Sequence, residues 1–355
     1  VEKLLLKTVS SRINTYVNEA YRKKSINFFF SELNNVCEDY NYWLSYFKRN
    51  AASLHNKRGK TYILSNHPAT PKGLAAKNVF NKKKIKLISF QHGVTAEISG
   101  SHDYCLSQHD SSASDEYYAF NEKAVSVAKR NPFNISKHRV YGMPKRYKRQ
   151  NSIFKLHKKY SILFLSNKLY RGNDGGISIW VNDFEFNQVE TNLIRKVLSK
   201  VNKKVFYKPY PASFDRYIEK DPILDEIDLH ENIEIIRNKK DARYLTGNSK
   251  LVICCIASST FSWAIMSNTP VIFINFSNIA PLKKEAVQLF SKGLFLFNYN
   301  DAKFLVNLKS FLSMPFDHIN SIWKEKSIHR KLLIKTFISS PENINQTGVF
   351  EDIKT

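Results

Sequence analysis

Short apolar runs alternate with amphipathic stretches along most of this chain from residue 61 onward. The spacing predicts strands at 62–66, 85–93, 117–120 and 138–141, with helices at 73–80 and 122–130 between them. Strands and helices in alternation are typical of a parallel sheet covered by helices. The first fifty residues differ, because their apolar positions recur at three- and four-residue spacing and predict helices.

A second series of the same kind begins at residue 160. It predicts strands at 160–167, 204–207, 233–236, 251–256 and 270–274, and helices at 185–201, 241–248 and 260–266. The polar stretch 145–159, rich in Lys and Arg, is the expected linker between the two series.

The chain has 355 residues, more than one hydrophobic core usually supports, so two domains are expected. We predict an N-terminal α/β domain with a helical extension in residues 1–150, a C-terminal α/β domain in 151–320, and a helical tail in 321–355. The predicted class is α/β, with two Rossmann-like domains that face a cleft. Loops at the carboxyl ends of the strands converge on such a cleft and make it the expected ligand site.

Composition narrows the protein class. The hydrophobic fraction is 43%, and no uninterrupted apolar run reaches the length of about 18 residues that a membrane span requires. The start Val1-Glu2-Lys3 has no features of an export signal, and the four cysteines lack metal-ligand spacing. We therefore expect a cytoplasmic protein.

The net charge of +24 favours a polyanionic partner, such as nucleic acid, an anionic membrane surface or a phosphorylated substrate. A chain rich in Lys, Asn, Ile and Phe is also what an A+T-biased genome encodes, so the charge alone leaves both explanations open. Lys and Arg are spread along the chain, without an aromatic-rich RNA-binding signature. We predict no nucleic-acid partner.

The most informative segment joins an apolar strand to Ser258, Ser259 and Thr260 and then to a helix. A helix N-terminus offers unpaired N–H donors and a partial positive charge, so it binds phosphate readily. Ser and Thr are also ordinary N-caps, which any α/β helix needs. Three successive hydroxyls exceed what capping requires.

Two further segments follow predicted strands. Lys208-Pro209-Tyr210-Pro211 is a rigid basic turn in which two prolines direct Tyr210, either toward a nucleotide or over a core edge. Gln91-His92-Gly93 places an imidazole beside a glycine that permits close approach or a left-handed turn. Glu97 and Asp103 are the nearby carboxylates, and Asn66 follows the preceding strand.

These segments, together with Gly142-Met143-Pro144-Lys145 before the linker, occur in an order that resembles GT-B glycosyltransferases of bacterial surface-polysaccharide assembly. The resemblance is greatest to transferases that use CMP-activated acidic sugars, namely retaining β-Kdo transferases and more distantly bacterial sialyltransferases. These families carry Lys-x-His-Pro and Ser-Ser/Thr elements that contact the cytidine nucleotide. Tyr210 stands in this chain where their pattern has histidine.

The resemblance implies a metal-independent enzyme that transfers an acidic sugar, Kdo above all, from a CMP-activated donor to a lipopolysaccharide or capsule acceptor. The acceptor would be lipid-linked at the inner face of the cytoplasmic membrane, and the CMP-sugar is a substrate, so no cofactor is expected. Catalysis is assigned to His92, Glu97 and Asp103. Nucleotide-sugar contacts are assigned to Gly142, Lys145, Asn167, Lys168, Lys208, Tyr210, Pro211, Ser258, Ser259 and Thr260. Sugar or acceptor contacts are assigned to Asn66, Gln91 and Arg171.

Three alternatives stay open at this point. A CDP-glycerol or CDP-ribitol phosphotransferase of the teichoic-acid type would keep the fold and a His-Gly pair. A basic nucleic-acid-binding protein would use the charge. A nonenzymatic α/β protein that only binds a partner would need neither the catalytic residues nor the nucleotide-sugar contacts.

Overall fold

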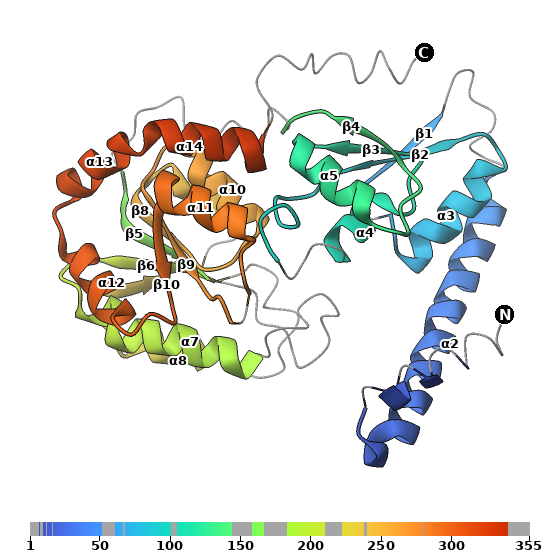
Figure 1. Cartoon of the computed structure of the whole chain (residues 1–355), viewed down its shortest axis with the longest axis horizontal. Helices are drawn as coiled ribbons and strands as arrows, with labels where there is room; N and C mark the ends of the chain where they lie inside the picture. The colour runs from blue at the N-terminus through green and yellow to red at the C-terminus, as the bar shows by residue number, and fades with distance from the viewer. Residues whose placement is uncertain are drawn as a thin grey trace.

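A computed structural model gives the fold of the chain (Figure 1). It describes residues 7, 10–11, 13–15, 17–51, 61–66, 68–100, 105–143, 158–166, 183–209, 222–237, 240–278 and 280–339. Two parallel sheets, formed one after the other along the chain, organise these residues into two α/β domains. The predicted α/β class with two Rossmann-like domains is confirmed.

The N-terminal sheet contains four parallel strands in sequence order. They are β1 (Tyr62–Ser65), β2 (Lys86–Phe90), β3 (Glu116–Ala119) and β4 (Lys137–Val140). The helices of this domain are α3 (Pro71–Asn81), α4 (Cys105–Ser111) and α5 (Glu122–Arg130). Local sequence explains the start of α3, since Pro71 fits the first turn and the Thr70 hydroxyl accepts a hydrogen bond from the Gly73 N–H at 3.1 Å.

The C-terminal sheet contains six parallel strands in the order β10-β9-β8-β5-β6-β7. They are β5 (Tyr160–Leu165), β6 (Val205–Lys208), β7 (Ile233–Ile235), β8 (Ser249–Cys254), β9 (Val271–Asn275) and β10 (Phe295–Asn298). The chain starts in the middle of this sheet, builds one edge and then returns to build the other. The order in which strands are added to the sheet therefore reverses between β5 and β8. Ligands of doubly wound sheets bind at the carboxyl ends of the strands at such a reversal.

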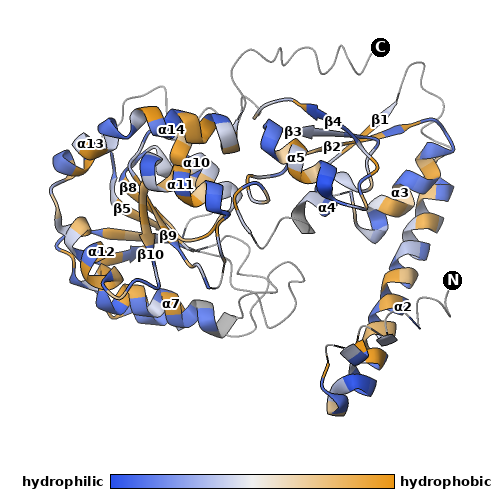
Figure 2. Cartoon of the chain, viewed as in Figure 1, coloured by the Kyte–Doolittle hydropathy of each residue, from blue (hydrophilic) through white to orange (hydrophobic). Residues whose placement is uncertain are grey.

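Helices lie on both faces of this sheet (Figures 1 and 2). They are α7 (Asp183–Lys196), the 3-10 turn η2 (Leu198–Lys200), α8 (Pro222–Asp228), α9 (Ala242–Thr246), α10 (Ser259–Met266), α11 (Lys284–Gly293) and α12 (Phe304–Ser313). All five residues of β9 are buried, as continuous apolar strands between two helical layers require.

The last helices of the described chain return toward the N-terminal domain. After α13 (Phe316–Glu325) and α14 (Ser327–Leu333), a π-helical turn, η4 (Ile334–Ile338), packs against α5. The Phe337 carbonyl accepts a hydrogen bond from the Asn121 side-chain amide at 2.7 Å, and the Ser339 hydroxyl accepts one from the Met143 N–H at 3.2 Å. The C-terminal segment therefore ties the two domains together.

The longest helix, α2 (Glu19–Asn50), has 32 residues and extends away from both sheets (Figure 1). At the α-helical rise it measures about 48 Å. It contacts α3 through its C-terminal half, where Leu44 and Phe47 pack on the small cluster around Phe80. No helix within the described ranges is long and apolar enough to cross a membrane.

The predicted linker at 145–159 lies almost entirely outside the described residues. The predicted helix at 185–201 ends at Lys196 in the structure and continues as the tighter turn η2.

Three phenylalanines fill the space between β9, α10 and α11 and anchor the core of the C-terminal domain. Phe261, Phe273 and Phe290 are almost completely buried, and their ring centroids lie 4.9 to 5.2 Å apart. Because α10 carries Phe261, this cluster also fixes the position of the helix start at Ser259.

We expect Phe261→Ala to lower the free energy of unfolding by about 3–5 kcal/mol, because the removed ring leaves a cavity that its neighbours cannot fill. Urea denaturation followed by circular dichroism measures the loss. Val306→Ala serves as the control, since that side chain on α12 is 70% exposed. Equal stabilities of the two variants would contradict a role for the phenylalanine cluster.

Candidate functional site

The two domains meet where the loop after β2 touches the first turn of α10. A Cβ atom placed on Gly93 would lie 2.7 Å from the Ser259 Cβ, closer than real Cβ atoms approach one another. Glycine at 93 is therefore required by the approach of a second domain. The contact brings two predicted segments together, Gln91-His92-Gly93 and Ser258-Ser259-Thr260.

The rest of the same loop is held by the C-terminal domain. Val94 and Ile98 are completely buried in the large core cluster of that domain. The Lys283 N–H donates to the Ile98 carbonyl at 2.9 Å, and the Gly100 N–H donates to the Pro281 carbonyl at 2.8 Å. The loop thus has a fixed position relative to α10.

His92 is paired with Asp110, a residue of α4. Its Nδ1 lies 3.1 Å and 3.2 Å from the two carboxylate oxygens, and its backbone N–H donates to the same carboxylate at 3.4 Å. The Asp110 side chain is 5% exposed and that of His92 is 27% exposed. With the Nδ1 proton on the Asp110 side, the lone pair of the ring lies on Nε2, as a proton acceptor requires.

The electrostatics of this pair favour the protonated imidazole. Burial lowers the pKa of His92, but the hydrogen bond and the negative charge of Asp110, with a further contribution from Glu97, outweigh burial and raise it above its ordinary value. His92 therefore changes charge above pH 6.5 rather than below it.

Glu97 lies inside the loop and is 1% exposed. One carboxylate oxygen accepts hydrogen bonds from the side-chain amides of Gln91 and Asn121, and the other accepts one from the Thr95 N–H at 3.0 Å. Desolvation raises the pKa of Glu97 despite these bonds. The carboxylate holds the loop in shape, and its predicted catalytic role stays a prediction.

Gln91, predicted to contact sugar or acceptor, is engaged in the same network. Its amide nitrogen donates to the Gly93 carbonyl at 2.9 Å, and its oxygen accepts from the Phe120 N–H at 2.7 Å. The side chain is 5% exposed. It connects the backbone directly after His92 to the backbone that follows β3.

The start of α10 presents polar groups that the helix itself does not use. Ser258 is the N-cap residue, but its hydroxyl makes no capping hydrogen bond. Ser258, Ser259 and Thr260 are all partly exposed. Free hydroxyls and N–H groups at the positive end of a helix form a site for an anion.

Other predicted contacts lie at strand ends of both sheets. Asn66 is exposed just after β1. Lys208 ends β6 and is 5% exposed; burial lowers its pKa, which the charge of Asp241 partly offsets. Gly142 follows β4 with a φ of +79°, a conformation that favours glycine, and a Cβ there would lie 3.9 Å from the Ser339 hydroxyl. The Gly142 N–H donates to the Ala119 carbonyl at 3.2 Å, at the end of β3.

The remaining predicted site residues lie outside the described part of the chain. They are Asp103, Lys145, Asn167, Lys168, Arg171, Tyr210 and Pro211.

Sequence reasoning missed Asp110 and Asn121. Asp110 follows His92 by 18 residues. This spacing does not predict a contact, because only the packing of α4 near the end of β2 brings the two side chains together. Asn121 had a local signal, because Asn before a helix is a preferred N-cap, and its side chain does cap α5 through the Ala124 N–H at 2.8 Å. Its second role, as donor to Glu97 and to Phe337, depends on the tertiary structure.

A third unpredicted group lies at the carboxyl ends of β5 and β6 in the C-terminal sheet. Glu190 on α7 is 1% exposed and accepts hydrogen bonds from the hydroxyls of Ser166 at 2.8 Å and Tyr207 at 2.7 Å. These bonds fix the ends of β5 and β6. Across the described ranges, no three His, Cys, Asp or Glu side chains are grouped so that they could hold a metal ion.

A family model described as the LIC12162 family transferase matches residues 9–292, about four fifths of the chain, including all of the N-terminal sheet and five of the six strands of the C-terminal sheet. The chain belongs to this family. It is therefore a transferase, as predicted. A comparison with curated protein sequences found no match.

Solved structures with a similar fold support the GT-B architecture of this transferase. A Listeria monocytogenes protein assigned as a UDP-N-acetylglucosamine 2-epimerase superposes with a TM-score of 0.53 and 13% identity, over 90% of this chain and 77% of its own. MnaA of S. aureus, solved with UDP, gives 0.51 and 10% over 85% and 80%. Alr3699/HepE of Anabaena, solved with UDP and glucose, gives 0.50 and 12% over 86% and 80%.

We expect Glu97→Gln to destabilise this transferase by about 1–3 kcal/mol. The new amide would place its own N–H donor against an N–H group that now donates a hydrogen bond to Glu97, so that neither donor is satisfied. Thermal or urea unfolding measures the change. Glu231→Gln, at an exposed position between α8 and β7, is the control. A variant with unchanged stability and lost activity would instead support the catalytic role predicted from the sequence.

Proposed function

We propose that this transferase is a glycosyltransferase that moves a sugar from a nucleotide-activated donor to an acceptor hydroxyl. The contact between Gly93 and Ser259 is the observation that supports this most directly. It joins the loop that carries His92, whose partner is Asp110 on α4, to a helix N-terminus suited to phosphate. A proton acceptor and an anion site side by side are the two groups that this reaction needs.

In the proposed reaction, the acceptor oxygen attacks the anomeric carbon of the donor sugar while the bond from that carbon to the phosphate oxygen breaks. The hydroxyl proton passes to Nε2 of His92, and Asp110 stabilises the imidazolium that forms. The electron pair of the broken bond leaves with the phosphate, whose charge the α10 N-terminus stabilises.

Such a single displacement inverts the anomeric centre. Retention through a carboxylate nucleophile is less compatible with Glu97, because both of its oxygens accept hydrogen bonds in a buried network. Inversion is therefore the stereochemical outcome we propose, and the anomeric configuration of the product, observed by NMR, tests it.

The proposed donor is a CMP-activated acidic sugar, Kdo above all, and the proposed acceptor a surface glycan of the lipopolysaccharide or capsule type. The order of Gln91-His92-Gly93, Lys208-Pro209-Tyr210-Pro211 and Ser258-Ser259-Thr260 supports the donor. Two structures of similar fold contain UDP, which supports a pyrimidine nucleotide in general. The basic chain suits a substrate with carboxylate and phosphate charges.

Nucleotide titration tests the donor. We expect heat of binding with CMP and none with CDP, and weaker CMP binding by about 10- to 100-fold in Ser258→Ala/Ser259→Ala, because hydrogen bonds to a charged phosphate are lost. Ser313→Ala is the control, since its hydroxyl bonds only within α12. Heat with UDP alone would change the proposed nucleotide from cytidine to uridine, and heat with CDP alone would favour the phosphotransferase.

Steady-state kinetics test the role of His92 as the general base. We expect His92→Ala to lower kcat about 100- to 10,000-fold with little change in nucleotide affinity, as loss of a general base does. His318→Ala, at an exposed position on α13, should leave kcat unchanged. A His92→Ala rate within threefold of the unaltered enzyme would contradict the assignment.

The pH profile tests the partner of the base. Neutral imidazole is the active form, so the rate should rise with pH, with a midpoint above 6.5 because Asp110 raises the pKa of His92. Asp110→Asn removes the charge, so the midpoint should move to lower pH while the maximal rate falls. An unmoved midpoint would show that Asp110 does not tune His92.

A further inference from the structure

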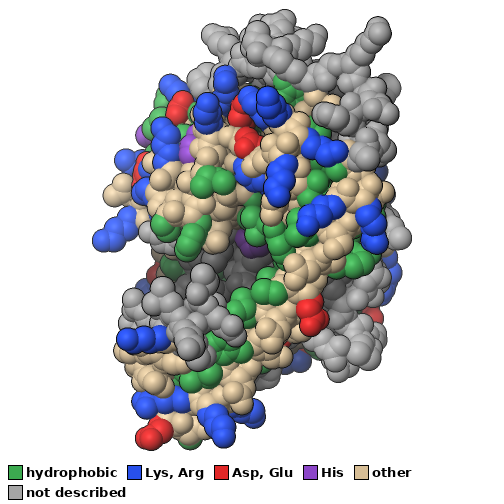
Figure 3. All heavy atoms as spheres, turned by 90° about the vertical axis from the view of Figure 1, so that its right-hand side faces the viewer, with side chains coloured by type: hydrophobic (Ala, Val, Ile, Leu, Met, Phe, Trp, Pro, Cys, Tyr) green, Lys and Arg blue, Asp and Glu red, His purple; other side chains and the backbone are tan. Residues whose placement is uncertain are grey.

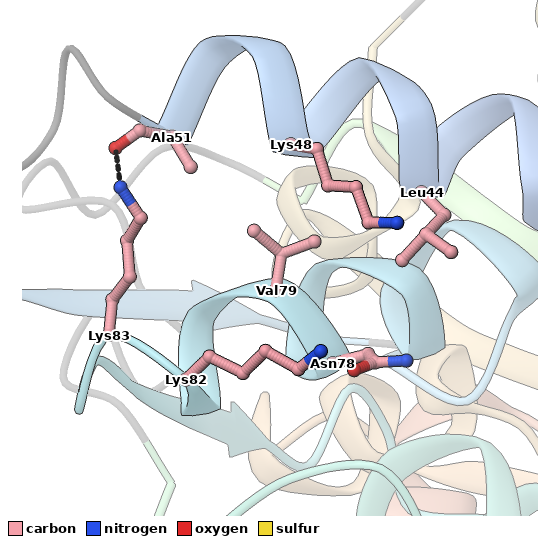
Figure 4. A pocket seen from close by; sticks show the side chains of 7 residues that line it. All are labelled: Leu44, Lys48, Ala51, Asn78, Val79, Lys82 and Lys83. Carbon is pink, nitrogen blue, oxygen red and sulfur yellow. Dashed lines mark hydrogen bonds between the residues drawn. The ribbon is translucent and has the colours of Figure 1, made fainter.

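A pocket that shares no residue with the proposed active site lies between the C-terminal end of α2 and α3 (Figure 4). It has a volume of about 220 Å³ and is lined by Leu44, Lys48, Ala51, Asn78, Val79, Lys82 and Lys83. Three of these seven residues are lysines, and none is acidic. At the share of about 30 Å³ per molecule in liquid water, the space corresponds to roughly seven waters.

The pocket has an apolar floor and a charged rim. Val79 and Ala51 are 7% and 0% exposed, and Leu44 packs beside them against α3. Figure 4 shows Lys48 extending from α2 above Val79, and Lys82 extending from the end of α3 beside Asn78. An amphiphilic ligand with one anionic group matches this arrangement better than a fully polar one.

Two of the three ammonium groups remain available for a ligand. Lys83 donates to the Ala51 carbonyl at 2.8 Å and so caps the end of α2. Lys48 and Lys82 are exposed and form no ion pair or hydrogen bond within the described part of the chain. Neighbouring lysines are used differently, since Lys77 pairs with Asp115 at 2.8 Å and Lys86 with Glu116 at 3.0 Å.

The surroundings carry the same sign of charge. Lys82, Lys83 and Lys84 follow α3 directly, and α3 itself contains no acidic residue. Figure 3 looks onto the face across which α2 runs, and Lys and Arg side chains predominate there over Asp and Glu. Such a surface attracts anionic bilayers, which hold phosphate groups at the boundary of apolar chains.

We propose that this pocket binds the phosphate headgroup of an anionic lipid and seats the transferase on a membrane surface. Lys48 and Lys82 bind the phosphate, and the floor of Leu44 and Val79 receives the apolar start of the lipid. Nucleic acid fits less well, because the seven described lining residues include no aromatic ring on which a base could stack. The proposal does not depend on the donor or on the reaction.

Vesicle co-sedimentation at physiological salt tests the proposal with the full chain. We expect binding to vesicles of phosphatidylcholine with one third phosphatidylglycerol, and none to pure phosphatidylcholine. Each lysine near an anionic surface contributes about fivefold to binding, so Lys48→Gln/Lys82→Gln should weaken it about 25-fold. The matched control Lys196→Gln/Lys324→Gln removes two exposed charges from α7 and α13 and should bind like the unaltered protein.

Several results would overturn the proposal. They are unchanged vesicle binding of the Lys48/Lys82 variant, equal loss in the control variant, and full displacement from vesicles by millimolar glycerol phosphate, which would indicate a site for a soluble phosphate ester. Loss of oligonucleotide binding without loss of vesicle binding would assign the pocket to nucleic acid. Nucleotide titration of the same variant should match the unaltered protein, which separates failure here from failure of the proposed enzyme function.

Discussion

Gly93 and Ser259 lie so close together that a side chain at 93 would collide with Ser259, and much of the proposed site depends on that contact. It sets the N-terminal loop with its imidazole against the start of α10. The loop is also bonded to the C-terminal domain through Ile98 and Gly100, so the two halves of the site keep their register. A larger side chain at 93 would have to push the helix or the loop away.

Buried polar groups give this loop its shape. Glu97 collects hydrogen bonds from Gln91, Asn121 and the backbone of Thr95, while Asn121 continues to Phe337 at the end of the chain. Buried polar groups are costly unless they are fully bonded, so such a network specifies one arrangement of its members. The network rigidly supports the loop that carries His92. The His92 side chain is partly exposed and is paired with Asp110.

The charge of the chain has more than one use in this picture. Some lysines pair with carboxylates in the N-terminal domain, as Lys77 does with Asp115, and one caps a helix end. Others, Lys48 and Lys82 among them, line a pocket and have no such partner among the residues that the structure describes. A net charge therefore says little about function until the structure separates paired from available cations.

The sequence by itself determined the elements and their class. Apolar periodicity is local, so the strand before Ser258 and the strand before Gln91 could be predicted, together with the parallel α/β arrangement. It also predicted polar segments at strand ends. Which side chains meet was decided by the tertiary structure alone: Asp110 reaches His92 across 18 residues, Glu97 is buried instead of open, and Gly93 makes room for another domain. These pairings depend on how helices and loops pack onto the sheets, and a local sequence pattern does not encode which distant residues this packing brings together.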